Sequence, residues 1–124
     1  MTAQATWTPI ATATADGTAT GITFNSIPQT YTDLILVQNL RSARAATTEQ
    51  FWVRPNNDTG SNYAYNYMQG DGTSATSSRL NNQSVANRFY IPAASATANL
   101  YGYSIVRLYN YTNTTQYKIG RAHV

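Results

Sequence analysis

With 124 residues, the chain can build one hydrophobic core and therefore one domain. The absence of cysteine excludes a disulfide-stapled fold and a thiolate metal site. Only 10% of the residues are charged, and the arginines behind the net charge of +3 are scattered, which excludes a clustered basic track for nucleic acid. No run approaches the roughly 18 apolar residues of a membrane helix, and the N-terminus lacks the features of a secretory signal, so no membrane partner or export is expected.

The first third of the chain predicts an edge strand, a turn and two further strands. Residues 7–14 contain Pro9 near their start, which suits an edge strand, and Asp16-Gly17 indicates a turn. Residues 21–27 place Ile22 and Phe24 on one face, as in a half-buried strand. The length and β-branched content of the most apolar run, 31–40, favour the core strand, buried on both faces, although periodicity alone does not exclude a helix there.

The rest of the chain alternates short strand-like runs with turn clusters. Residues 51–54 predict a short strand, 56–62 a tight or left-handed turn, and 69–78 a loop, while 79–86 are too polar to assign. Further strands are expected at 89–92 and 100–111. Six to eight short strands with this turn spacing indicate an all-β fold, an antiparallel β-sandwich of jelly-roll type.

Few residue types suited to catalysis are present. The carboxylates Asp58 and Asp71 could form a glycosidase-like pair after folding, or contribute one ligand each to Ca²⁺ sites, but both stand beside glycine or asparagine in predicted loops. Solvated turn residues are the preferred interpretation, because such neighbours favour Asx turns. We therefore predict a non-enzymatic protein without catalytic residues, cofactor or metal.

Tyrosine is the residue type that says most about a possible function, because ten tyrosines are present and each has a flat apolar ring with a polar hydroxyl. Two interpretations of these tyrosines follow: they fill cross-strand positions of a sheet, or they form a binding face. The candidate ligand or interface residues, predicted from their period of two, are Tyr63, Tyr65, Tyr67, Tyr101 and Tyr103.

The last six residues, Ile-Gly-Arg-Ala-His-Val, resemble the translation of a common sequencing adapter, ATCGGAAGAGCACACGTC, whose next codon is the stop TGA. On this interpretation residues 1–118 are a single natural domain, incomplete at its C-terminus, and 119–124 are a non-native tail. The only histidine, His123, would then have no evolved role, and the natural protein would continue past Lys118 with one or more closing strands.

Four segments resemble a family of small virion proteins of tailed phages from marine and other environments. They are 7–14 (WTPIATAT), 22–34 (ITFNSIPQTYTDL), 57–63 (NDTGSNY) and 110–115 (NYTNTT). The resemblance implies a jelly-roll β-sandwich that serves as a tail, fibre or head-decoration component, and a final apolar strand beyond the present end. Where the family reads Arg-Phe-Asn-Gly, this chain has Arg54-Pro55-Asn56-Asn57, so Pro55 should end the preceding strand early.

Two functions follow as expectations. The first is a non-catalytic structural protein of the virion that forms homo-oligomers and contacts other virion proteins. The alternative is a carbohydrate-binding module for host recognition, in which exposed tyrosines such as Tyr63, Tyr65 and Tyr67 stack on a host-surface glycan.

Overall fold

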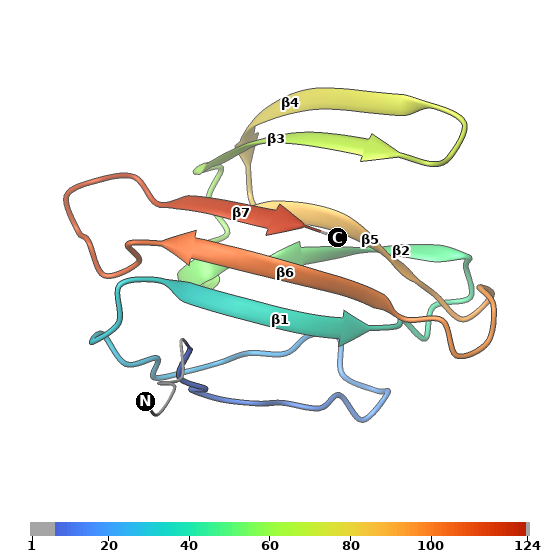
Figure 1. Ribbon diagram of the computed structural model, residues 1–124, viewed down its shortest axis with the longest axis horizontal. Helices are drawn as coiled ribbons and strands as arrows, with labels where there is room; N and C mark the ends of the chain where they lie inside the picture. Colours follow the sequence, from blue (N-terminus) through green and yellow to red (C-terminus); the bar gives the residue numbers. More distant parts are fainter. Residues whose placement is uncertain (1–6, 124) are drawn as a thin grey trace, which may run out of the picture.

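The computed structural model describes residues 7–123, which form seven strands and one short 3₁₀ turn (Figure 1). All four strand pairings are antiparallel, so the predicted all-β antiparallel fold is confirmed. Within these residues no helix has the length and apolarity that crossing a membrane requires. The elements are β1 (Leu34–Leu40), β2 (Thr48–Val53), η1 (Pro55–Asn57), β3 (Tyr63–Gly70), β4 (Ala75–Gln83), β5 (Asn87–Pro92), β6 (Gly102–Tyr109) and β7 (Ile119–His123).

The strands form three sheets, in the orders β1-β6-β7, β2-β5 and β3-β4. The pairs β1–β6, β2–β5 and β3–β4 are nested, so the chain from β1 to β6 is one long antiparallel ribbon folded over itself. The nested pairs stack into a sandwich-like arrangement of antiparallel sheets. In Figure 1 the β1-β6-β7 sheet lies across the centre, with β2 and β5 behind it and the β3–β4 hairpin beyond β7.

The core lies between the β1-β6-β7 sheet and the β2-β5 sheet. Phe89 and Ile91 of β5 and Val106 of β6 are buried together. Phe51 stands opposite Phe89 across the β2–β5 ladder, with ring centroids 5.4 Å apart. Side chains of alternating residues from both sheets therefore meet in the middle, which makes the arrangement sandwich-like. The half-buried residues packed around this cluster are Leu36, Leu40, Phe51, Val53 and Ala122.

One polar pair lies on the inner face of the β1–β6 ladder. Ser104 is 2% exposed, and the amide Nε2 of Gln38, the residue opposite it, donates a hydrogen bond of 2.8 Å to its hydroxyl. A buried hydroxyl without a partner would cost roughly 1–3 kcal/mol, so this pairing lets a polar residue occupy the interior.

Arg41, just after β1, organises the loop between β5 and β6. Its Nη1 donates to the carbonyls of Thr97 (2.8 Å) and Leu100 (2.9 Å), and its Nη2 donates to those of Ala94 (3.3 Å) and Ala96 (3.0 Å). A planar guanidinium with several fixed donors can satisfy all four carbonyls at once. Arg41 therefore fixes the path by which the chain passes from one sheet to the other.

Two predicted strands at the N-terminal side are wrong. Neither 7–14 nor 21–27 forms a strand in the structure. Ile22 and Phe24 are half-buried while Thr23 and Asn25 are exposed, so the predicted alternation of 21–27 is present, but no strand pairs with the segment in the described part of the chain. Alternation predicts which side chains face inward, whereas a strand also needs a neighbouring edge for its backbone groups.

The core strand is placed correctly but is not buried on both faces. β1 covers 34–40 of the predicted 31–40, and Val37 in its middle is 49% exposed. Val37 lies on the outer face of the sheet, which is only partly covered, because Ile35 and Ile105 on that face are half-buried. The prediction of burial on both faces is therefore wrong.

The β3–β4 hairpin departs most from the sequence prediction. β3 extends to Gly70 and β4 begins at Ala75, so most of the predicted loop 69–78 is strand, and β4 also accounts for most of the unassigned 79–86. β4 is exposed along nearly all its length because it pairs with β3 and makes no comparable contact with any other strand. A polar strand of this kind has no apolar alternation for sequence reasoning to detect.

The turn before this hairpin agrees with expectation. β2 ends at Val53, two residues before Pro55, as predicted from the Pro55 substitution in the family pattern. Asn56 and Asn57 have φ values of 52° and 53°, the left-handed conformation predicted for this turn.

β7 contains most of the tail that resembles an adapter. It pairs with β6, yet Arg121 stands directly opposite Arg107, and like charges in that position are destabilising. Of its five residues only Ala122 is half-buried against the core. Backbone groups at a free sheet edge can pair with almost any extended segment, so this pairing requires no evolved side chains.

We predict that deleting residues 119–124 leaves the fold intact and changes the melting temperature by less than about 4 °C, because β7 adds little side-chain burial. Thermal unfolding followed by circular dichroism measures this change. Ile91→Ala, in the buried cluster, is the comparison and should cost about 2–5 kcal/mol. A deletion as damaging as Ile91→Ala would contradict the interpretation of β7 as a dispensable edge.

Candidate functional site

The three turn aspartates each bind the backbone of their own loop. Asp16 Oδ1 accepts the amides of Thr18 (2.9 Å) and Ala19 (3.1 Å). Asp71 Oδ1 accepts those of Thr73 (2.9 Å) and Ser74 (2.8 Å). These are the Asx-type turns predicted for aspartates beside glycine.

Asp58 makes the same kind of local contact. Its Oδ1 accepts the amide of Gly60 at 2.8 Å, and the side-chain amide of Asn62 lies 3.2 Å from Oδ1 and 3.0 Å from Oδ2. Across residues 7–123, no three His, Cys, Asp or Glu side chains lie close enough together to hold a metal ion.

Hydrogen bonding lowers the pKa of all three carboxylates. The pKa of Asp16 is lowered, chiefly by the Thr18 amide, and that of Asp71 chiefly by the Ser74 amide. The side-chain amide of Asn62 is the main cause of the lowered pKa of Asp58. A carboxylic general acid needs the opposite shift, a pKa raised toward neutrality, so these groups are arranged to stabilise turns.

An ion pair closes one end of the β1–β6 ladder. Asp33 Oδ2 accepts hydrogen bonds from Nε (3.1 Å) and Nη2 (2.6 Å) of Arg107, while Asp33 Oδ1 accepts the amide of Asn110 at 2.9 Å. The Arg107 guanidinium lies 4.8 Å from the centre of the Tyr109 ring, within cation–π range. The pKa of Asp33 is lowered, first by the Asn110 amide and then by Arg107.

The candidate tyrosines of β3 share one half-buried face. Tyr63, Tyr65 and Tyr67 alternate with exposed residues. The Tyr63 hydroxyl lies 3.2 Å and 3.3 Å from the carbonyls of Pro55 and Asp58, and partial burial raises the pKa of Tyr63. The Tyr65 hydroxyl is buried without a hydrogen-bond partner in the described part of the chain. The three rings therefore do not form an exposed row.

The outer face of the β1–β6 ladder has an apolar, partly exposed centre, with Asn39 toward one end and Arg107 toward the other. Val37 is paired with Ile105 and Asn39 with Tyr103, so these side chains share one side of the sheet. Val37 is 49% exposed and Tyr103 is 55% exposed. We call Ile35, Val37, Tyr103 and Ile105 the aliphatic face. Sequence reasoning identified Tyr103 but missed Val37, because Val37 stands in the continuous apolar run 34–37, which has no alternation to show which residues face outward.

Tyr101, the remaining candidate, lies just before β6. It is 53% exposed, next to Leu100, which is 50% exposed. The carbonyl of Leu100 is one of the four that bind Arg41. This places an exposed apolar pair on a loop of defined conformation just before the start of β6.

The β2-β5 sheet also has an exposed outer face, which sequence reasoning missed. Gln50 stands opposite Tyr90, and Trp52 stands opposite Arg88. Trp52 is 51% exposed and Tyr90 is 49% exposed. We call Gln50, Trp52, Arg88 and Tyr90 the aromatic face. The register of β2 with β5 brings together residues about 40 positions apart in the sequence. This register is a property of the fold, and the short run at 51–54 does not reveal which strand will pair with it.

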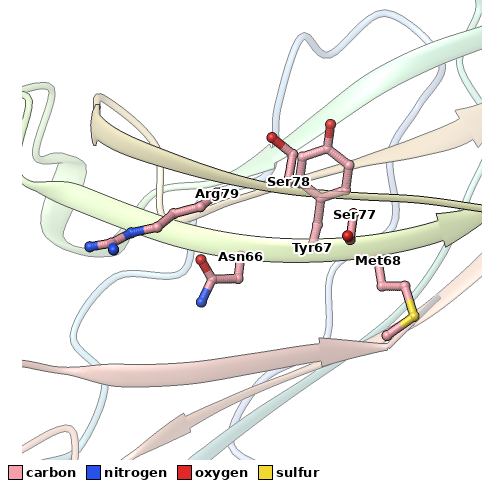
Figure 2. Close-up of a pocket in the computed structure, with 6 residues that line it drawn as sticks. All are labelled: Asn66, Tyr67, Met68, Ser77, Ser78 and Arg79. Atoms are coloured by element: carbon pink, nitrogen blue, oxygen red, sulfur yellow. The ribbon is translucent and has the colours of Figure 1, made fainter.

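A shallow hollow lies on the β3–β4 hairpin. Figure 2 shows that Tyr67 and Ser78 project from one face of the hairpin, whereas Asn66 and Met68 project from the other. Its lining residues thus belong to both sides of a two-stranded ribbon. The hollow is open surface rather than an enclosed site.

Comparison with protein-family models, with curated proteins and with solved structures found no match.

We predict that Arg107→Gln raises the pKa of Asp33 only part of the way to its ordinary value, because the Asn110 amide still favours the carboxylate. Carboxyl ¹³C NMR across a pH titration measures this midpoint. Since the pKa is lowered in the folded state, the contribution to stability is complete above the ordinary value and is lost as the pH falls below it.

Asp16 is the internal control, because its partners lie in its own turn and its midpoint should not move in Arg107→Gln. An Asp33 midpoint that does not change in this variant would show that the ion pair has no influence on the carboxyl.

Proposed function

We propose that this chain is a non-catalytic structural subunit of a tailed-phage virion, a tail, fibre or head-decoration component that works through contacts with copies of itself and with other virion proteins. The observation that supports this most strongly is the amount of surface that the single chain leaves uncovered.

The accessible surface of the chain is 9803 Å² for a mass of 13.6 kDa. A compact monomer of that mass exposes about 6,600 Å², so the excess is about 3,200 Å². Even fully extended, the seven residues outside the described part would expose only about 1,000 Å². Most of the excess therefore belongs to residues 7–123, that is, to the exposed segment 7–33 together with the sandwich and its loops.

The size of this excess suits assembly. A standard protein–protein interface buries about 800 Å² on each partner, so the excess equals more than one such interface. Within residues 7–123, only Val85, Phe89, Ile91, Ala93 and Val106 are buried hydrophobic residues. A chain with so little interior gains stability by covering its outer surfaces with neighbours.

The aliphatic face has the composition that a permanent subunit contact needs. Val37 and Tyr103 are about half exposed, with Ile35 and Ile105 beside them. Interfaces of permanent oligomers are apolar at the centre and rich in aromatic residues. The four segments that resemble phage virion proteins give the particle as the setting, and the nested strand pairs agree with the jelly roll that this resemblance implies.

We expect the purified chain to form oligomers and Val37→Asp to weaken them at least about tenfold, because a charge would be buried at the contact. Light scattering after size-exclusion chromatography over a range of concentrations measures the mass. Thr76→Asp, at an exposed position of β4, is the control for adding a charge to a strand.

Circular dichroism should show that both variants keep the fold, since both positions are exposed. A wild-type chain that stays monomeric at every concentration, or equal weakening by Val37→Asp and Thr76→Asp, would contradict the proposal.

A further inference from the structure

The aromatic face differs in chemistry from the aliphatic face on the other sheet. Its four side chains are two large rings, one amide and one guanidinium, arranged as two cross-strand pairs on neighbouring strands. Trp52 and Tyr90 occupy diagonal positions of this block and are each about half exposed. The two rings thus provide adjoining apolar surfaces on one side of a sheet.

The position of this face is fixed from within. The Nε2 of Gln50 donates a 3.0 Å hydrogen bond to the Tyr90 hydroxyl, which orients both side chains. On the opposite side of the same two strands, Phe51 and Phe89 pack against each other in the core. A ligand would therefore meet side chains supported by the sandwich interior, which lowers the entropy lost on binding.

Several polar groups on the aromatic face have unused hydrogen-bonding capacity. Within residues 7–123, the indole N–H of Trp52 and the guanidinium of Arg88 donate to no protein group. The side-chain carbonyl of Gln50 likewise accepts no hydrogen bond there. The face thus combines flat apolar rings with both donors and an acceptor.

We propose that this face binds the pyranose rings of a polysaccharide, with Trp52 and Tyr90 against the apolar side of the sugar and Arg88 and Gln50 hydrogen-bonded to its ring substituents. A pyranose has a C–H face and a rim of hydroxyl groups, so it matches rings flanked by donors and acceptors. The inference concerns a different sheet from the subunit contact and does not rest on it.

A second copy of the chain suits this face less well than a sugar does. Burying the free donors of Arg88 and Trp52 in a protein contact would require matching acceptors, whereas hydroxyl groups or a sugar carboxylate supply them directly. The face is open and only two strands wide, so each site binds weakly. Repetition of the site in an oligomer would strengthen binding by avidity.

Affinity electrophoresis of the purified chain tests this directly. The gels contain a neutral polysaccharide (dextran, mannan or laminarin) or an acidic one (alginate or hyaluronate), at low and at high salt. We expect at least one polysaccharide to slow the wild-type chain at both salt concentrations. Trp52→Ala and Tyr90→Ala should each reduce the affinity about tenfold, while Trp52→Phe should retain part of it.

Trp7→Ala is the matched control, because Trp7 is 60% exposed but lies outside the sheets, and its removal should leave binding unchanged. The neutral and acidic gels show whether Arg88 meets hydroxyl groups or a carboxylate. Light scattering on the same variants shows whether the oligomer has changed.

Four results would overturn the proposal. The first is that no polysaccharide slows the wild-type chain, and the second is that Trp7→Ala and Trp52→Ala have equal effects. The third is that only acidic polysaccharides slow the chain and that high salt abolishes this in every variant. The fourth is that Trp52→Ala loses the oligomer. The last result would assign the aromatic face to a subunit contact.

Discussion

The contact of Phe89 and Ile91 on β5 with Val106 on β6 is the constraint on which the rest of the structure depends, because it joins the two main sheets. This core is small for a chain of this length, and Phe51 and the half-buried leucines of β1 pack only around its edge. Gln38 and Ser104 occupy part of the interior, where a hydrogen bond offsets the cost of burying a hydroxyl. Arg41 then fixes the connection from β5 to β6, so the register of the core and the path of the loop depend on each other.

Because the core uses only one face of each sheet, two outer faces remain open, and they differ in kind. The aliphatic face on β1 and β6 is apolar at its centre, where Val37 stands opposite Ile105, as a subunit contact requires. The aromatic face on β2 and β5 combines rings with free donors, as a sugar site requires. In the account proposed here, one sheet assembles the particle while the other meets a glycan, and the arrangement of the sandwich keeps the two surfaces apart.

Much of the fold could be predicted from the sequence, because strands that line the core are rich in apolar and β-branched residues. This is why β1 lies within the most apolar run, 31–40, and why β5 and β6 lie close to or within the predicted ranges 89–92 and 100–111. β4 was missed because it pairs with β3 and makes no comparable contact with any other strand. Residues 21–27 alternate correctly without a partner strand, and partner choice is a long-range property. The same limit applies to the surfaces. A period of two showed that Tyr63, Tyr65 and Tyr67 share a face, but it did not show that this face is half-buried. Only the register of β2 with β5 brings Trp52 beside Tyr90.

The central claim is that the uncovered surface of this sandwich is covered by neighbouring subunits in a phage particle. Hydrogen-exchange mass spectrometry, comparing purified particles of a phage that encodes this chain with the dilute isolated protein, tests it most directly. The account predicts that peptides of this chain are present in the particle and that the amides of β1 around Val37 exchange more slowly there than in isolation. Absence of the chain from the particle, or equal exchange of these amides in both states, would contradict it.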